Sequence, residues 1–552
     1  MKKSSFLEGA MIATIGIVIC KIIGLFYVIP FYAIIGTQGG ALYTYAYSIY
    51  AIFLSLSNSG IPIAMSKVIS EYNTLGYHHT KERAYKIGAT LIITLGVFFF
   101  IILIIFAPML AKMIIGDAVG GNSIESVTLV IRIVATALLI VPLESVTQGY
   151  LQGQKFIFPS SMANIIEQLV RVTIIIAGSF TVIRVFHLSV ETAVGISVFA
   201  ATVGCLVAYF YLLRVLAKNG RKLKRHESAR LAEKKITSKD IIKKIICYAL
   251  PFVVIDVMNS ISGMVDTMTV VNTMIKLGYS TQIAETTIGV LATWATKLNM
   301  IIVAIALGVS TSLIPHIASA NVKKDWKDLN RKVNQPLQAL LVTTIPMAIG
   351  LSFLATPVWV VFYGFDQLSI DIFRFYILQA ISFSFFTVLI DIMQTLNRSK
   401  ISLGTLFGTV VGKVLLNIPI MTLFAHIGIE AYYGPIVATL LIQSIAITFL
   451  LYQLKKLYHV KYWNTVKIAI KTVLCVGIML LTLMILGLFI STTTTSRMVG
   501  VGLSVFYAVV GIIVYLVCAF KSNLIYEVFG ERMVHGIIKK IPGLRKKISV
   551  KG

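Results

Sequence analysis

Long apolar stretches recur along the whole chain, and no soluble fold of this size has room to bury so many of them. Each is about as long as the roughly 20 residues that an α-helix needs to cross a bilayer. The stretches lie near residues 10–35, 42–70, 86–111, 127–151, 158–183, 190–216, 245–275, 286–320, 335–362, 370–396, 401–425, 431–454, 465–490 and 498–520. Transmembrane β-strands would be shorter and would alternate apolar with polar residues. We therefore predict an all-α polytopic membrane protein with 14 transmembrane helices.

The basic residues are distributed between these stretches in a regular way. The 552-residue chain is 57% hydrophobic and only 13% charged, yet its net charge is +27. Lys and Arg concentrate after the even-numbered predicted helices, most densely in 217–244, and are sparse after the odd-numbered ones. Cytoplasmic loops of membrane proteins carry this excess of positive charge. We therefore attribute the charge to topology rather than to nucleic-acid binding, and predict that both termini are cytoplasmic.

Several classes of function lack their sequence signatures. The N-terminal MKKSSFLEGA resembles the start of a signal peptide, but no small-residue cleavage site follows it before about Ile35, so we expect a retained first helix. The five cysteines stand singly, without the spacing of a metal site or a disulfide framework. No P-loop, GxSxG or HExxH motif is present. We therefore expect no enzyme, no cofactor and no bound metal, which leaves coupling to protons, to sodium or to the membrane potential open.

The two halves of the chain resemble each other in three places, in the same order. An Ile-Pro pair at 61–62 has a counterpart at 314–315, APMLAKMIIGD has TPVWVVFYGFD, and ESVTQGYLQGQK has DIMQTLNRSK. Equivalent predicted helices run in the same direction through the membrane, so the repeat is parallel. Parallel repeats pack as two lobes that bind substrate between them and expose it to each side in turn.

This repeat divides the chain into five predicted parts. They are an N-lobe of helices 1–6 (1–216), a basic cytoplasmic linker (217–244), a C-lobe of helices 7–12 (245–454), the additional helices 13–14 (455–522) and a basic cytoplasmic tail (523–552). The tail mixes apolar with basic residues, so it is either a solvated segment or an interfacial helix on the anionic inner leaflet.

Ionisable residues inside the apolar stretches are the main candidates for function. Each costs about 2.5–3.5 kcal/mol at the centre of a membrane helix on insertion scales. The set is Lys21, Arg132, Glu144, Glu167, Arg171, Asp256, Asp266, Lys297, Asp391 and Lys413. Glu167 and Arg171 are four residues apart on one helix, and we expect them to pair with each other for structural reasons. The candidates for ion coupling or gating are Asp256, Lys413, Asp266, Asp391 and Glu144.

Four of these residues, Lys21, Asp256, Lys297 and Lys413, lie closest to the predicted midplane. Lys21 and Lys297 stand one in each lobe, and two ammonium groups facing a wet cleft would attract an anion. Alternatively, Lys21 pairs with a buried carboxylate and only fixes packing. Asp256 and Lys413 lie at matching depth, so they form either an ion pair or part of a proton- or sodium-linked site.

The predicted architecture resembles the multidrug/oligosaccharidyl-lipid/polysaccharide exporter superfamily. SGIPIAMSKVISEYNTLG and the segment from SLIPHIASANVKK to TPVWVVFYG are similar to its polysaccharide-exporter branch. Over nearly its full length the chain resembles the MurJ-type lipid II flippases of Gram-positive bacteria and the related stage V sporulation protein B. The resemblance implies a plasma-membrane flippase that moves undecaprenyl-pyrophosphate-linked peptidoglycan precursor from the inner to the outer leaflet, with cell-wall synthesis proteins as further partners.

The resemblance also implies roles for particular residues. Basic residues in the central cavity of MurJ-type proteins engage the pyrophosphate of the lipid. Lys21 matches an arginine of the helix 1 pattern, and Lys297 roughly matches a basic position in helix 8. Tyr27 stands where the family has a second arginine, so the basic cluster is thinner here, and Tyr27 itself is a candidate substrate contact in the cavity. Asn58 and the tyrosines of helix 2 are candidate contacts for the sugars.

Sodium binds some members of the family between helices 7 and 11. Asp256 falls in that region, but Lys413 stands where an acid is expected, and its ammonium could replace the ion. Three other functions are compatible with the sequence: a flippase for another lipid-linked glycan such as a teichoic or capsular unit, a multidrug or cation exporter, and a membrane scaffold for wall synthesis. The repeat and the buried charges argue against the scaffold.

Overall fold

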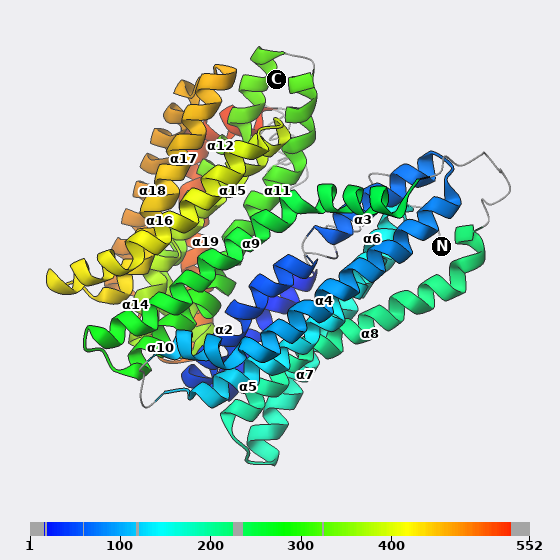
Figure 1. The fold of residues 1–552 in the computed structure, drawn as a ribbon. Helices are drawn as coiled ribbons and strands as arrows, with labels where there is room; N and C mark the ends of the chain where they lie inside the picture. The colour runs from blue at the N-terminus through cyan, green and yellow to red at the C-terminus, as the bar shows by residue number, and fades with distance from the viewer. Residues whose placement is uncertain are drawn as a thin grey trace. The chain divides into compact units, whose positions relative to one another are not determined.

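The computed structural model describes residues 16, 19–58, 60–116, 121–224, 236–322 and 325–531, and within these ranges it contains helices and no strands (Figure 1). The helices of the first half are α2 (Val28–Asn58), α3 (Ile61–Thr74), α4 (His78–Ile115), α5 (Ile124–Ala135), α6 (Val141–Gly153), α7 (Ile157–Phe180), α8 (Val190–Lys224) and α9 (Ser238–Lys276). They are followed by α10 (Thr281–Gly289), α11 (Ala295–Val322), α12 (Trp326–Phe353), α13 (Ala355–Tyr363), α14 (Gln367–Tyr376), α15 (Gln379–Thr395), α16 (Ser399–His426), α17 (Gly434–Tyr458), α18 (Trp463–Phe489), α19 (Arg497–Lys521) and α20 (Leu524–Phe529).

The prediction of an all-α membrane protein is confirmed. Twelve helical segments in the described ranges are long and apolar enough to cross a bilayer. The first predicted span, 10–35, lies partly outside the described residues. The predicted span 245–275 falls within α9, which is helical throughout but is not among the twelve. The count of fourteen and the cytoplasmic placement of the termini therefore stay predictions.

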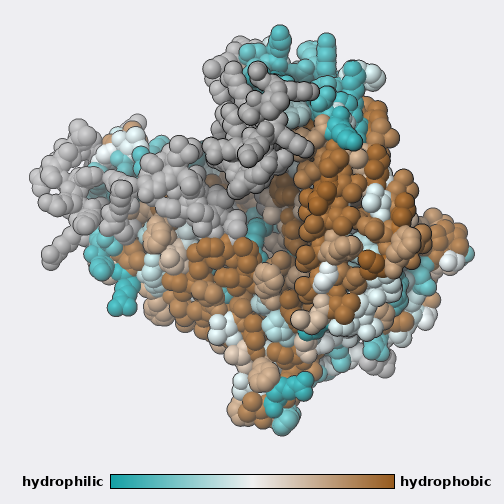
Figure 2. Space-filling model, turned by 180° about the vertical axis from the view of Figure 1, so that it is seen from behind, coloured by the Kyte–Doolittle hydropathy of each residue, from teal (hydrophilic) through white to brown (hydrophobic). Residues whose placement is uncertain are grey.

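Large apolar side chains cover much of the outer surface. Hydrophobic residues form broad areas on the face shown in Figure 2. In α18 and α19 the side chains of Leu488, Phe489 and Met498 are more than 80% exposed. Water would disfavour so much exposed apolar area, whereas lipid tails would not. The surface therefore agrees with a protein that spans the bilayer many times.

The chain forms two compact units. Unit 1 comprises Met1–Trp294 with Val414–Ala431, and unit 2 comprises Ala295–Lys413 with Tyr432–Gly552. The 3₁₀ and π segments of the first half, η1 (Thr136–Leu139), η2 (Thr181–Val185) and η3 (Val290–Trp294), belong to unit 1. Because α9 and α10 pack against α2, they join unit 1 as well. The predicted lobes 1–216 and 245–454 are bodies that would move against each other during transport, and this division stays a prediction.

Two glycines shape α2 and α3. Gly36 has φ 66° and ψ −167°, which breaks α2 into two arms at the point where the sequence predicted the loop between helices 1 and 2. Gly60 has φ 72° and precedes α3, in which Pro62 occupies the first turn. Glycine adopts positive φ without a steric cost, and proline suits the first turn because no intrahelical partner awaits its missing N–H. The predicted helix 42–70 is therefore two helices.

α3 and α6 approach each other very closely. A Cβ atom added at Gly149 would lie 2.7 Å from both Met65 Cβ and the carbonyl oxygen of Pro62, and one added at Gly153 would lie 2.6 Å from the carbonyl oxygen of Ser66. Gly149 and Gly153 are four residues apart and share one face of α6. Small residues in this spacing let two membrane helices come together at backbone distance.

Unit 2 has its own core between α12, α18, α19 and α20. Tyr515 of α19 donates a hydrogen bond to the carbonyl oxygen of Val342 at 2.7 Å, and Tyr507 donates one to the carbonyl oxygen of Ile490. Leu524 and Ile525 of α20 are buried in the same core. The first residues after helix 14 thus pack on unit 2, whereas the remainder of the predicted tail, 532–552, lies outside the described residues.

We expect Gly149→Leu to destabilise the protein, because the new side chain must displace Met65 or the backbone of α3. Overpacking of this kind costs about 1–3 kcal/mol. The measurement is thermal unfolding in detergent, monitored as the decrease of the monodisperse protein fraction with temperature. Gly477→Leu is the matched control, since a Cβ atom added there has no neighbour within 4 Å. An equal effect of the two substitutions would contradict the close packing of α3 and α6.

Candidate functional site

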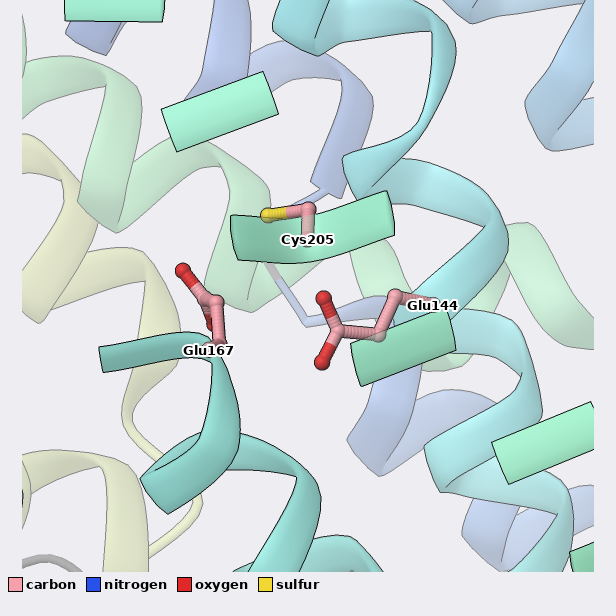
Figure 3. A group of neighbouring side chains, drawn as sticks. All are labelled: Glu144, Glu167 and Cys205. Atoms are coloured by element: carbon pink, nitrogen blue, oxygen red, sulfur yellow. The ribbon is translucent and has the colours of Figure 1, made fainter. Parts of the chain in front are cut away.

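Three polar side chains from consecutive helices meet inside unit 1. Glu144 of α6, Glu167 of α7 and Cys205 of α8 place their carboxylate and sulfur atoms within 4.8 Å of one another. Figure 3 shows the three side chains converging from separate helices. Glu144 is 3% exposed and Cys205 is buried, whereas the Glu167 side chain keeps 23% of its surface. With Arg171, which pairs with Glu167, these residues form what we call the α6–α8 cluster.

Local sequence explains how α8 comes so near to α7. A Cβ atom added at Gly204 would lie 2.9 Å from the carbonyl oxygen of Glu167 and 3.2 Å from Arg171 Cβ. The absence of a side chain at Gly204 therefore lets α8 approach the backbone of α7. The adjacent residue, Cys205, is thereby brought beside the two carboxyl groups.

The α6–α8 cluster is tied together by hydrogen bonds. Arg171 Nη1 lies 3.4 Å from Glu167 Oε1, and its Nη2 donates to Gln168 Oε1. The predicted pairing of Glu167 with Arg171 is thus confirmed. Gln148 Nε2 donates to Glu144 Oε1 at 2.9 Å and to Asn164 Oδ1 at 2.7 Å. The guanidinium of Arg171 therefore pairs with Glu167, whereas Glu144 accepts its hydrogen bond from the neutral amide of Gln148.

Aromatic residues of α2 line the same region. The rings of Tyr43 and Tyr47 stack with centroids 4.4 Å apart, and Tyr47 meets Tyr50 edge-on at 5.8 Å. Arg171 lies within electrostatic range of Tyr47, Tyr43 and Tyr27. Tyr27 is itself 7% exposed. Phenol rings and hydroxyls beside a guanidinium offer both stacking surfaces and hydrogen-bond donors to a polar ligand.

A second polar group joins α9 to α16 within unit 1. Asn417 Nδ2 donates to Asp266 Oδ1 at 2.9 Å and to Thr269 Oγ1 at 2.9 Å. Asn417 is completely buried, and its Oδ1 atom accepts no hydrogen bond from the described residues. A buried carbonyl oxygen left without a donor next to a carboxylate suits a hard cation such as sodium. We call these three residues the α9–α16 group.

The other predicted site residues differ in exposure and lie on several helical segments. Lys21 is partly exposed in the helical residues that precede α2, and Lys297 is partly exposed on α11. Asp256 is exposed on α9, and Asp391 is partly exposed on α15. Lys413 of α16 is 6% exposed.

Their predicted roles stay predictions. Lys21 and Lys297 belong to different units, so a cavity shared by the two lysines is still an expectation. The side chain of Asn58, the last residue of α2, lies outside the described part of the structure.

A seam of hydroxyl groups runs between α2 and the segments α9 and η3. Ser48 lies 2.9 Å from Thr267 and Ser55 lies 3.0 Å from Ser260, measured between side-chain oxygens. Thr44 meets Thr293 of η3 at 2.5 Å and also donates to the carbonyl oxygen of Gly40 in its own helix. Hydroxyls that can return to a carbonyl of their own helix lose little when the two helices separate.

Sequence reasoning missed Cys205, Gln148, Asn164 and Asn417. All four are uncharged, so the search for buried charges passed over them. One signal was available, because Gln148 follows Glu144 by four residues and therefore shares its helix face.

Comparison with known proteins places the chain in a family. The sequence profile described as "Polysaccharide biosynthesis protein" matches residues 6–321, which is more than half of the chain. The chain belongs to this family. A curated relative, the lipid II flippase MurJ of Bacillus subtilis (strain 168), is 31% identical over 550 residues, covering 96% of this chain and 98% of the relative.

Solved structures have the same fold. A structure of "Lipid II flippase MurJ, inward closed conformation" superimposes with a TM-score of 0.64 at 17% identity, over 94% of this chain and 99% of that one. An inward-facing multidrug resistance MATE transporter of the MOP superfamily gives 0.61 at 12% identity, over 80% and 98%. These two structures confirm the predicted fold, that of an all-α transporter. The α6–α8 cluster and the α9–α16 group therefore lie in a member of the polysaccharide biosynthesis protein family that has the fold of a transporter.

We expect Thr267→Val to weaken the contact of α2 with α9. The substitution removes the hydroxyl that meets Ser48 while it keeps the side-chain shape. Hydrogen bonds between membrane helices contribute about 0.6 kcal/mol on average and at most about 1.7 kcal/mol. Thermal unfolding in detergent measures the loss. Thr422→Val is the control, because that exposed hydroxyl bonds carbonyls of its own helix; equal stability of the two variants would show that the seam contributes nothing.

Proposed function

We propose that this protein is a flippase that moves lipid II, the undecaprenyl-pyrophosphate-linked precursor of peptidoglycan, from the inner to the outer leaflet of the bacterial plasma membrane. The observation that carries the proposal is 31% identity to a lipid II flippase along nearly the whole of both chains. The shared fold with a second protein of that name, and with MATE transporters, supports transport by alternating access.

The interior of unit 1 suits the polar head of such a lipid. The sugars and peptide need hydrogen-bond partners and aromatic surfaces, which Tyr43, Tyr47 and Tyr50 offer in a continuous row. We propose Lys21 and Lys297 as the contacts of the pyrophosphate, because ammonium groups bind phosphate oxygens strongly where water is scarce. The lipid tail can stay in the bilayer while the head crosses, so little apolar surface has to enter water.

The direct test is complementation. The gene is expressed in Bacillus subtilis depleted of its lipid II flippases, and the fraction of lipid II that faces outward is measured with an impermeant probe. Outward lipid II at the normal rate supports the proposal. Unchanged accumulation on the inner leaflet, with the protein correctly inserted, would overturn it in favour of a flippase for a teichoic or capsular lipid. A multidrug or cation exporter would instead lower the accumulation of an organic cation.

We expect Lys21→Ala and Lys297→Ala each to lower the rate of lipid II flipping by roughly tenfold or more. One hydrogen bond to a charged group contributes about 1.5–3 kcal/mol, which corresponds to this factor. Lys21→Arg and Lys297→Arg, which keep the charge, should restore most of the rate. Lys112→Ala is the control, because Lys112 is an exposed residue of the last turn of α4. Full activity of both alanine variants would exclude the lysines as substrate contacts.

We also propose that the α9–α16 group couples transport to a cation. Asp266 supplies a carboxylate and Thr269 Oγ1 a neutral oxygen, and rotation of the Asn417 amide by 180° would turn its unpartnered Oδ1 towards them in place of Nδ2, which completes the oxygen ligands that sodium prefers. A bound cation would satisfy the Asn417 oxygen and interact favourably with the carboxylate of Asp266. In this proposal Asp266 is the coupling residue, and Asp256, which is exposed on the same helix, is not.

We expect Asp266→Asn to abolish any stimulation of flipping by sodium, whereas Asp256→Asn should leave it in place. Substitution of the carboxylate removes the charge that attracts the ion but keeps the shape of the side chain. The measurement compares flipping in vesicles that contain sodium with flipping in vesicles that contain only a bulky organic cation. A wild-type rate that is the same in both buffers would exclude sodium coupling without touching the assignment of the substrate.

A further inference from the structure

The charges of the α6–α8 cluster do not balance. Glu144 and Glu167 contribute two negative charges when ionised, and Arg171 contributes one positive charge at 3.4 Å from Glu167. The cluster lies within three helices that are long and apolar enough to span the membrane. An uncompensated charge in such surroundings is costly, and two carboxylates this close repel each other strongly. One proton on the pair would bring the total to zero.

The hydrogen bonds indicate which carboxyl group carries that proton. Glu167 has the guanidinium of Arg171, so its ionised form is stabilised. Glu144 accepts a hydrogen bond from the neutral amide of Gln148 on Oε1 and lies beside the thiol of Cys205, and the ion pair of Arg171 in the described residues is with Glu167. The second oxygen of Glu144 can therefore hold a proton directed towards Glu167, as in other pairs of carboxyl groups that share one proton.

Among the described contacts, the charged side chains of the neighbouring helices pair with residues outside the α6–α8 cluster. From α2, the neutral side chains of Tyr47 and Tyr50 lie near Arg171 and Cys205. They add no charge to that of the Glu167–Arg171 pair. From α4, Glu82 and Tyr85 form hydrogen bonds with Tyr150 and Thr147 of α6. Lys81 of α4 donates to Gln154, the residue that follows α6. From α3, Lys67 and Glu71 contact Tyr248 and Lys244 of α9. η1 carries no titratable side chain. α5 and η2, which also pack on α7 and α8, carry Glu125, Arg132 and Arg184, and all three side chains are exposed. Cys20, which acts electrostatically with Glu167 and Arg171, and its neighbour Lys21 precede α2.

We propose that Glu144 and Glu167 bind one exchangeable proton, and that its binding and release accompany the transport cycle of this protein. The link to the cycle rests on the proposed flippase function, whereas the proton itself does not. A neutral pair stabilises the packing of α6, α7 and α8 against one another. If these helices part, water reaches Glu144 and the carboxyl group loses its proton, which leaves a charge that opposes repacking.

A metal ion is the alternative occupant, because two carboxylates and a thiolate are ligands for zinc. Arg171 argues against it, since a divalent cation would lie close to the guanidinium and repel it. A second alternative is that Lys21 supplies the missing positive charge. The pair would then be ionised at all times, and no exchangeable proton would exist.

The test is infrared difference spectroscopy on the full-length protein in lipid vesicles, in which a protonated carboxyl group gives a C=O stretching band that shifts in D₂O. We expect a band that disappears as the pH rises, with an amplitude of about one proton per protein. Glu144→Gln should remove it, and Glu191→Gln, a carboxyl on the same lobe that bonds Ser126 outside the cluster, should not. The wild-type titration remains decisive even if Glu144→Gln does not fold.

Three results would overturn the proposal: no titrating band in the wild type, a band unaffected by Glu144→Gln in a folded variant, or stoichiometric zinc in the purified protein that is lost in Cys205→Ser. A band that appears only in Lys21→Gln would assign the balancing charge to Lys21. In the flipping assay, the rate of the wild type should depend on pH and that of Glu144→Gln should not. If the protein does not flip lipid II at all, the infrared result still stands or fails independently.

Discussion

The need to satisfy every charge and polar group inside an apolar bilayer governs this structure. In water an isolated Glu or Asn would be indifferent to its neighbours, but in the membrane each must find a partner on another helix or on its own. The pair Glu167–Arg171, the bridge from Gln148 to Asn164, and the link from Asn417 to Asp266 are the results. Two of these contacts join helices: α6 with α7, and α9 with α16. Residues that connect the helices are therefore also residues to which we assign the binding of a proton or a cation.

Unit 1 also contains two different kinds of helix contact, and the difference has a mechanical meaning. At Gly149 and Gly153 the α3 and α6 backbones nearly touch, so any sliding would produce a clash, and the two helices must move as one. Between α2 and α9 the contacts are pairs of hydroxyls such as Ser48 with Thr267. Each hydroxyl can fall back on a carbonyl of its own helix, so this contact separates at low cost. A transporter needs both rigid bundles and a face along which they part.

The sequence was sufficient for the fold class because hydropathy depends on long stretches rather than on single residues. It also predicted the Glu167–Arg171 pair, since a spacing of four residues fixes proximity on any helix. It could not predict that Cys205 and Glu144 join that pair, because their meeting depends on the register between helices, which Gly204 sets by its lack of a side chain. The break at Gly60 inside an apparently continuous apolar stretch was missed for a similar reason: glycine and proline are common in membrane helices, and only the positive φ distinguishes a break. The predicted shared cavity of Lys21 and Lys297 also depends on more than local sequence, because the two residues belong to different units.

The distribution of positive charge completes the argument. The resemblance to MurJ-type flippases implies that Tyr27 replaces an arginine, in which case Lys21 is the one cation of the predicted helix 10–35. Arg171 lies within electrostatic range of Tyr27, which places a guanidinium near the position that lacks one. Its charge is shared with Glu167, and an ionised Glu144 nearby would reduce it further. In our proposal, a proton on the Glu144–Glu167 pair therefore has two effects: it removes a buried charge, and it leaves the positive field of Arg171 less opposed, so that this field attracts the pyrophosphate more strongly.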